Sequence, residues 1–161
     1  MHGLYNTDSI RNSTEKINTQ IQFSGRDTIS SDVNRIYQEW ANLLEGNAVS
    51  MRLLSGLHAH TIVFMALTTI GDHVAILPET AGGHMSTKAI LQRLGLIVHE
   101  LEVDYTNQKI DIDASLDMLK KYSPKVIFID RSEGLVYEDF SWLKEVPSYK
   151  IFDASQYLTN I

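Results

Sequence analysis

The sequence predicts an α/β protein with an open, mainly parallel sheet and helices on both of its faces. Short apolar segments typical of strands alternate with longer patterns typical of helices. One short segment, residues 126–129 (Val-Ile-Phe-Ile), is apolar at every position, as expected of a strand buried on both faces. The chain has 161 residues, 43% of them hydrophobic, which is enough for one domain with a core.

The first part of the chain precedes this alternation. Residues 1–30 are rich in Asn, Thr, Ser and Gln and predict an N-terminal arm that lies against something else. Ser30-Ser31-Asp32 is an N-cap signal, and the apolar residues after it repeat at helical spacing up to about Gly46. We therefore place the α/β domain at residues 31–161.

Within that domain, the run from Leu57 to Ile70 is apolar nearly all round and predicts a buried helix. Asp113 is expected to cap a later helix that stops before Pro124. The other expected elements, in order, are an extended segment at 49–54, strand 73–77, helix 86–94, strand 96–103, a turn at 104–109, strand 126–129, a helix near 139–145 and strand 149–153.

Composition excludes several classes of function. The net charge is −6 and the basic residues are scattered, which argues against nucleic-acid binding. No apolar run reaches the roughly 18 residues that a membrane span needs. The first 22 residues lack the pattern of a signal peptide, and the chain has no cysteine. We expect a cytoplasmic protein with no membrane or nucleic-acid partner.

Four polar stretches follow apolar segments or open a helix, and parallel strands would bring them to one edge of the sheet. They are Ser55-Gly56, Gly82-Gly83-His84, Arg131-Ser132 and Asp153. Each also has a purely structural explanation as a helix cap or a turn. His58 and His60 are two residues apart, so on a helix they point about 200° apart and cannot share a metal ion. We expect no metal site.

Together these stretches resemble the large domain of fold-type I pyridoxal-phosphate enzymes, and serine hydroxymethyltransferase in particular. The resemblance lies in Ser55-Gly56 before an apolar helix, Ala81-Gly82-Gly83-His84 after a strand, and Asp153-Ala154-Ser155-Gln156 at a strand end. It runs from about residue 25 to residue 161.

The resemblance implies a site for pyridoxal 5'-phosphate. Ser55, Gly56 and Leu57 would bind its phosphate, and His84 would stack on its ring. Ser132 would lie near the phenolic oxygen. Asp153 would pair with the ring nitrogen, so that the ring acts as an electron sink for the α-carbon of an amino-acid substrate. Gln156 stands where the family has a histidine.

Two departures from the family limit what the resemblance implies. Thr19 and Ile21 align where family members have the tyrosine and glutamate that serve folate and serine chemistry. The Schiff-base lysine lies well beyond the aspartate in the family, and no lysine occurs in residues 154–161. The catalytic residues therefore stay unknown, and we expect this chain alone to be inactive. It would be an N-terminal portion, incomplete at the C-terminus, with an exposed apolar edge, working as a homodimer or with a chain that supplies the rest of the fold.

The favoured function is the cofactor-binding portion of an enzyme that acts at the α-carbon of an amino acid and is not a true folate-dependent hydroxymethyltransferase. A decarboxylase- or aldolase-like enzyme is the first alternative, and a catalytically inactive partner subunit is the second. The third is an unrelated α/β module that binds nucleotide or phosphate. The absence of a Walker-type loop and of Gly-x-Gly-x-x-Gly counts against the third.

Overall fold

The structure is a computed structural model that describes residues 26–131 and 138–156, with side chains from residue 31 onward. The chain divides into two compact units, residues 1–54 and 55–161, which are treated separately below. Among the described residues, no helix is long and apolar enough to cross a membrane.

The first unit contains one described helix, α2 (Arg26–Leu43). It begins about one turn before the predicted cap at Ser30, so the predicted start is wrong. Serine is tolerated inside a helix as well as at its start, and hydrophobic spacing alone does not fix the first turn. The helix ends close to the predicted position, because Glu45 takes a left-handed conformation and the Gly46 N–H donates to the Ala41 carbonyl at 2.8 Å.

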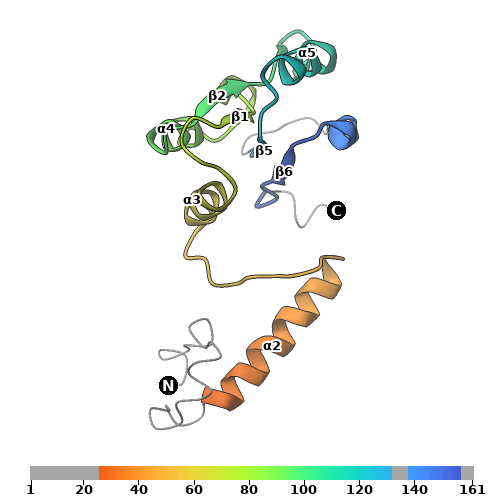
Figure 1. The fold of residues 1–161 in the computed structure, drawn as a ribbon. Helices are drawn as coiled ribbons and strands as arrows, with labels where there is room; N and C mark the ends of the chain where they lie inside the picture. The colour runs from red at the N-terminus through yellow and green to blue at the C-terminus, as the bar shows by residue number, and fades with distance from the viewer. Residues whose placement is uncertain (1–25, 132–137, 157–161) are drawn as a thin grey trace. The chain divides into compact units, whose positions relative to one another are not determined.

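The second unit is built on a four-stranded sheet in which every neighbouring pair of strands is parallel (Figure 1). The spatial order is β2 (Ile97–Glu100), β1 (His73–Ile76), β5 (Val126–Ile129) and β6 (Tyr149–Phe152). β5 is buried at all four positions, as the sequence predicts for a central strand. The expected α/β fold with a mainly parallel sheet is confirmed.

Alternate residues of the central strands face opposite layers. Val74, Ile76, Val126 and Phe128 pack in one cluster with Phe64 of α3 (Gly56–Leu67) and Leu91 of α4 (Thr87–Arg93). Ala75, Leu77, Ile127 and Ile129 pack in the other with Met118 and Leu119 of α5 (Ile112–Tyr122) and Leu143 of the 3-10 helix η4 (Ser141–Glu145). Helices therefore cover both faces of the sheet, which also confirms the prediction (Figure 1).

Two local expectations are corrected, and a third, the turn at 104–109, is confirmed. Asp111, not Asp113, caps α5, since its Oδ1 accepts from the Ala114 N–H at 3.0 Å and Asp113 lies in the first turn. The predicted turn at 104–109 is the loop of a short antiparallel hairpin, β3 (Val103–Asp104) with β4 (Lys109–Ile110). The helix expected near 139–145 is the 3-10 helix η4. Over so few residues, the spacing of apolar residues does not distinguish a 3-10 helix from an α-helix.

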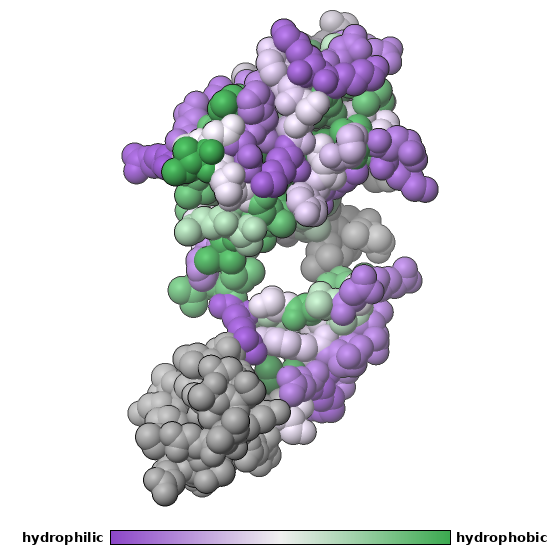
Figure 2. Space-filling model, viewed as in Figure 1, coloured by the Kyte–Doolittle hydropathy of each residue, from purple (hydrophilic) through white to green (hydrophobic). Residues whose placement is uncertain are grey.

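The sequence predicts that α3 is buried on all sides, but the structure buries only one of its faces. Phe64 and His60 face the sheet and are buried, whereas Ile62 and Met65 on its other face are 45% and 63% exposed. Hydrophobic side chains are accordingly visible over α3 in Figure 2. At the side of the sheet, the edge strand β6 also exposes Tyr149 and Phe152. Apolar composition predicted a buried helix, but within the described residues only one layer covers it.

Candidate functional site

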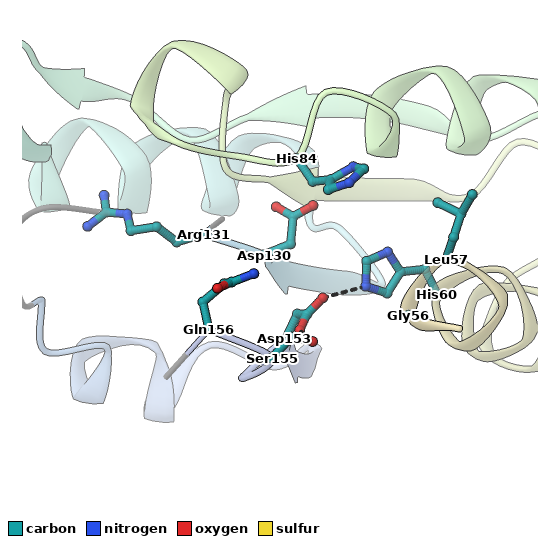
Figure 3. A pocket seen from close by; sticks show the side chains of 9 residues that line it. All are labelled: Gly56, Leu57, His60, His84, Asp130, Arg131, Asp153, Ser155 and Gln156. Carbon is teal, nitrogen blue, oxygen red and sulfur yellow. Dashed lines mark hydrogen bonds and ion pairs between the residues drawn. The ribbon is translucent and has the colours of Figure 1, made fainter. Parts of the chain in front are cut away.

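A cavity of about 250 Å³ lies at the carboxyl ends of the strands (Figure 3). Segments distant in sequence contribute to it: the start of α3, the turn after β1, and the residues directly after β5 and β6. Its lining residues are Gly56, Leu57, His60, His84, Asp130, Arg131, Asp153, Ser155 and Gln156. This edge of a parallel sheet is where open α/β proteins bind their ligands.

The start of α3 forms one wall. Ser55 is the N-cap, and its Oγ accepts from the His58 N–H at 3.1 Å. Gly56 and Leu57 open the helix, so their N–H groups have no acceptor within it. A Cβ placed on Gly56 would meet no atom within 4 Å, so the space beside its Cα is open. Unpaired N–H groups at the positive end of a helix dipole suit an anion.

The turn after β1 forms a second wall and requires its two glycines. Gly82 has φ 89°, in the left-handed region that disfavours other residues. Gly83 has no room for a side chain, since a Cβ there would lie 2.4 Å from the Leu77 carbonyl oxygen. The turn ends at His84, whose ring is exposed and whose Nδ1 accepts from the Ser86 N–H at 3.2 Å. His84 therefore presents a flat, oriented ring to the cavity (Figure 3).

Asp130, the first residue after β5, ties this turn to the sheet. Its Oδ2 accepts from the Thr87 hydroxyl at 2.5 Å, and its carboxylate also accepts from the backbone N–H of His84. Burial raises the pKa of Asp130, and these hydrogen bonds and the nearby His60 and His84 only partly offset that effect. The Asp130 carboxyl group thus holds the backbone of His84 in position.

Asp153, the first residue after β6, is held on both oxygens. Its Oδ1 accepts from the Ser155 N–H at 2.9 Å and from the Ser155 hydroxyl, and its Oδ2 lies 2.7 Å from Nε2 of His60. Burial raises its pKa, but the hydrogen bonds from Ser155 and His60 outweigh burial and lower the pKa below its ordinary value. Asp153 therefore stays ionised at neutral pH.

Arg131 completes the cavity next to Asp130. Its guanidinium forms a buried ion pair with Glu138, in which the two side chains are only 6% and 8% exposed. The other Glu138 oxygen accepts from the Ile110 N–H at 2.5 Å. Arg131 is thus anchored to the β4 strand through Glu138.

The structure brings together five of the seven site residues that the sequence predicts: Gly56, Leu57, His84, Asp153 and Gln156. Ser55 lies next to the cavity as the cap of α3, and Ser132 falls outside the described residues. Arg131, which the sequence placed at this edge together with Ser132, does line the cavity, whereas sequence reasoning missed His60, Asp130 and Ser155 as lining residues. A signal was available for His60, which is four residues after Gly56 and so on the same face of the helix. For Asp130 the signal was its position directly after a buried strand.

Serine hydroxymethyltransferases are among the curated proteins that this chain resembles. A serine hydroxymethyltransferase from Pyrobaculum islandicum is 32% identical over 124 residues, which are 73% of this chain and 29% of that protein. One from Pyrobaculum aerophilum is 30% identical over 153 residues, covering 83% of this chain and 36% of that protein. The chain thus spans about a third of the length of the curated relatives it matches. No protein-family model matches the chain.

Among solved structures, an L-threonine transaldolase from Pseudomonas fluorescens, determined in its internal aldimine state, superposes with a TM-score of 0.74. The superposition covers 84% of this chain and 31% of that one, at 18% sequence identity. The fold is therefore that of the large domain of fold-type I pyridoxal-phosphate enzymes, as the sequence resemblance implied. Within that class, the chain is serine hydroxymethyltransferase-like and corresponds to a part of such a protein.

Proposed function

We propose that this chain forms the cofactor-binding part of a pyridoxal-phosphate enzyme that acts at the α-carbon of an amino acid. One observation carries the proposal. The start of α3, His84 and Asp153, each assigned a cofactor contact by the resemblance, line a single cavity although they are far apart in the sequence.

The residues present fit the cofactor. The N–H groups of Gly56 and Leu57 would hold its phosphate in the open space beside Gly56. The exposed ring of His84 would stack on the pyridine ring. Asp153 would accept a hydrogen bond from a protonated ring nitrogen, because it is ionised and one of its roughly four acceptor positions is left after His60 and Ser155.

When bound, the cofactor supplies an electron sink for a carbanion at the substrate α-carbon. The chain's own residues bind and orient that group. Asp153 would keep a proton on the ring nitrogen by a charge-assisted hydrogen bond, and Asp130, which accepts from the backbone N–H of His84, would hold that histidine in place to stack on the ring. The amide of Gln156 lines the same cavity and can donate a hydrogen bond, but it cannot carry the charge of the family's histidine.

The reaction we propose is not folate-dependent hydroxymethyl transfer. Thr19 and Ile21, which lie outside the described residues, support this, because the family has a tyrosine and a glutamate at the aligned positions. A decarboxylase- or aldolase-like reaction of the same cofactor is the alternative.

None of the described residues that line the cavity is a lysine, so we propose that a covalent anchor for the cofactor comes from elsewhere. No lysine follows Lys150 in the sequence, and Lys150 donates to the Val146 carbonyl rather than lining the cavity. We therefore propose that turnover requires further polypeptide or a second chain, and that the 161 residues alone bind the cofactor without catalysis. A partner subunit that has lost catalysis is the second candidate function, and the same observation favours it.

The test is binding of pyridoxamine 5'-phosphate to the full chain, measured by the ligand's fluorescence. This amine form cannot attach to surface lysines, so it reports only the non-covalent site. We expect saturable binding that inorganic phosphate weakens by competition at the α3 start. Asp153→Asn should weaken binding by about 10- to 100-fold, since a hydrogen bond to a charged group contributes about 1.5–3 kcal/mol.

A dissociation constant weaker than about 1 mM, equivalent to about 4 kcal/mol, would overturn the proposal. Binding that Asp153→Asn leaves unchanged would do the same, because the ligand would then lie elsewhere. Glu39→Gln, on the surface of α2, is the charge-matched control and should bind like the wild type.

A further inference from the structure

We propose that His60 is a positioning residue for Asp153, and that through it the site distinguishes ligands with a protonated ring nitrogen from those without one. The inference rests on the proposed function, since it assigns Asp153 to the ring nitrogen. Neither the resemblance nor the sequence pattern assigns His60 a part in the site.

The contact itself is close and sheltered. Nε2 of His60 lies 2.7 Å from Oδ2 of Asp153, and the two side chains are 10% and 21% exposed. Figure 3 shows the imidazole reaching from α3 to the aspartate at the end of β6. Because a carboxylate can only accept, Nε2 carries the hydrogen and donates it.

The second nitrogen of the His60 ring, Nδ1, is buried and makes no hydrogen bond within the described part of the chain. The ring packs edge-on against Phe128 of β5, with centroids 4.7 Å apart and planes at 74°. Packing therefore fixes where the imidazole lies, and its hydrogen bond is directed to Asp153. A buried polar ring that makes one hydrogen bond, to a carboxylate in the cavity, is well placed to hold that carboxylate in one orientation.

Two residues donate to different oxygens of Asp153. Ser155 donates twice to Oδ1, and His60 donates once to Oδ2. Ser155 is only two residues from Asp153 in the sequence. His60 lies on α3, whose first residues, Gly56 and Leu57, line the cavity and would bind the phosphate. His60 thus connects Asp153, the proposed acceptor for the ring nitrogen, to the helix that would bind the phosphate. This contact helps to fix the distance between the two groups that would bind the ends of the ligand.

The competing explanation is that His60 only joins α3 to β6. The two explanations differ in which ligands they affect. Loss of a structural tie would weaken every ligand of the cavity alike. Loss of a positioning residue would weaken only ligands that use Asp153.

The experiment measures the affinity of the full chain for two ligands, pyridoxamine 5'-phosphate and its 1-deaza analogue, in which carbon replaces the ring nitrogen. Wild type should prefer the nitrogen ligand. His60→Phe keeps the ring's packing and removes the donor, and should weaken binding of pyridoxamine phosphate about tenfold or more while leaving the deaza analogue unchanged. His60→Gln, whose amide can place a donor near the Nε2 position, should restore much of the preference. Thr61→Val, at the next residue of α3, is the control and should keep it.

A second measurement needs no ligand. Carboxyl carbon NMR of Asp153 in the free protein should show a higher pKa in His60→Phe than in wild type, since the hydrogen bond from His60 is among the causes that lower it. Asp130, His84 and Arg131 line the same cavity and are unchanged in the variant. Thermal unfolding of each variant establishes that it is folded.

The outcomes separate the two proposals. If wild type binds neither ligand, the proposed function fails and this inference fails with it. If wild type binds and His60→Phe weakens both ligands equally, the positioning role alone is overturned. An unchanged pKa of Asp153 in a folded His60→Phe protein would also overturn it, whatever the ligands do.

Discussion

The two ends of the sheet each hold a histidine in a hydrogen-bonded pair, and the pairs differ in what surrounds them. At the carboxyl end, His60 donates to Asp153 beside the cavity. At the amino end, Nδ1 of His73, the first residue of β1, lies 3.0 Å from Nε2 of His99. The His99 ring also stacks on Tyr122, with centroids 3.9 Å apart.

The difference shows that strand polarity, not residue type, marks the candidate site. At the carboxyl ends of the strands, His84, Asp130 and Asp153 line one cavity together with the first residues of α3, whose N–H groups have no acceptor within the helix. At the amino end, His73 and His99 pack on Tyr122 at the last turn of α5, and none of these three lines the 250 Å³ cavity. Substitutions at the carboxyl end should therefore change both stability and ligand binding, and those at the amino end should change stability alone.

The largest effect is expected from the ion pairs. Arg131→Met leaves Glu138 charged in a buried site and should lower the free energy of unfolding by about 3–5 kcal/mol, measured by urea denaturation. At the amino end, Lys125 pairs with Asp72 at 2.8 Å, but the side chains are 43% and 26% exposed, so Lys125→Met should cost far less.

The double variant Arg131→Met/Glu138→Gln provides the control. It removes the stranded charge and should recover part of the stability lost in Arg131→Met. A cost for Arg131→Met no larger than that for Lys125→Met would show that the Arg131–Glu138 pair is open to solvent.

A second comparison uses one glycine from each end. Gly83→Ala would press a methyl group against the Leu77 carbonyl and should cost about 3 kcal/mol, with a loss of pyridoxamine phosphate binding because His84 follows directly. Gly71, in the turn before β1, has φ 88° but open space, so Gly71→Ala should cost about 1–2 kcal/mol by strain alone. Gly71→Ala should leave binding unchanged. Equal effects of the two variants on binding would break the distinction between the ends.

The sequence predicted most of this fold because its strands are short and strongly apolar. Residues 126–129 form a buried strand and the glycines of the 78–84 turn are required, as their types suggested. Helix starts were less predictable, since Ser30 and Asp113 are good cap residues that the structure uses inside helices. Neighbouring residues compete for a cap, and only the final geometry decides between Asp111 and Asp113.

The site was predicted in outline but not in its interactions. Gly56, His84 and Asp153 follow from position along the chain, because Gly56 begins α3, Asp153 directly follows β6 and His84 lies in the segment between β1 and α4. The contact of His60 with Asp153 joins residues 93 positions apart, and the sequence has no pattern that pairs them. Burial of Asp130 likewise depends on how the 78–84 turn folds over it, which is a tertiary effect.

A smaller effect separates two helix starts. Ser55 caps α3 beside the cavity, and Asp111 caps α5 away from it. Ser55→Ala and Asp111→Ala should each lower the free energy of unfolding by about 1 kcal/mol, because each frees one backbone N–H. Only Ser55→Ala should also weaken pyridoxamine phosphate binding, measured by fluorescence titration. If Asp111→Ala weakened binding as much, the effect would come from the loss of overall stability and not from the start of α3 in the cavity.

The smallest effect is a pH dependence at the amino end. Burial, then the neighbouring His73 and Lys121, lower the pKa of His99 below 6.5. The neutral ring is therefore favoured in the folded state, so its contribution to stability is complete above pH 6.5 and is lost as pH falls through the lowered pKa. His99→Phe keeps the stacking on Tyr122 and should flatten this part of the stability profile, measured by urea denaturation at a series of pH values. Its affinity for pyridoxamine phosphate at neutral pH should equal that of wild type. A change in that affinity would mean that the amino end acts on the cavity through β1, and the contrast between the two ends of the sheet would no longer hold.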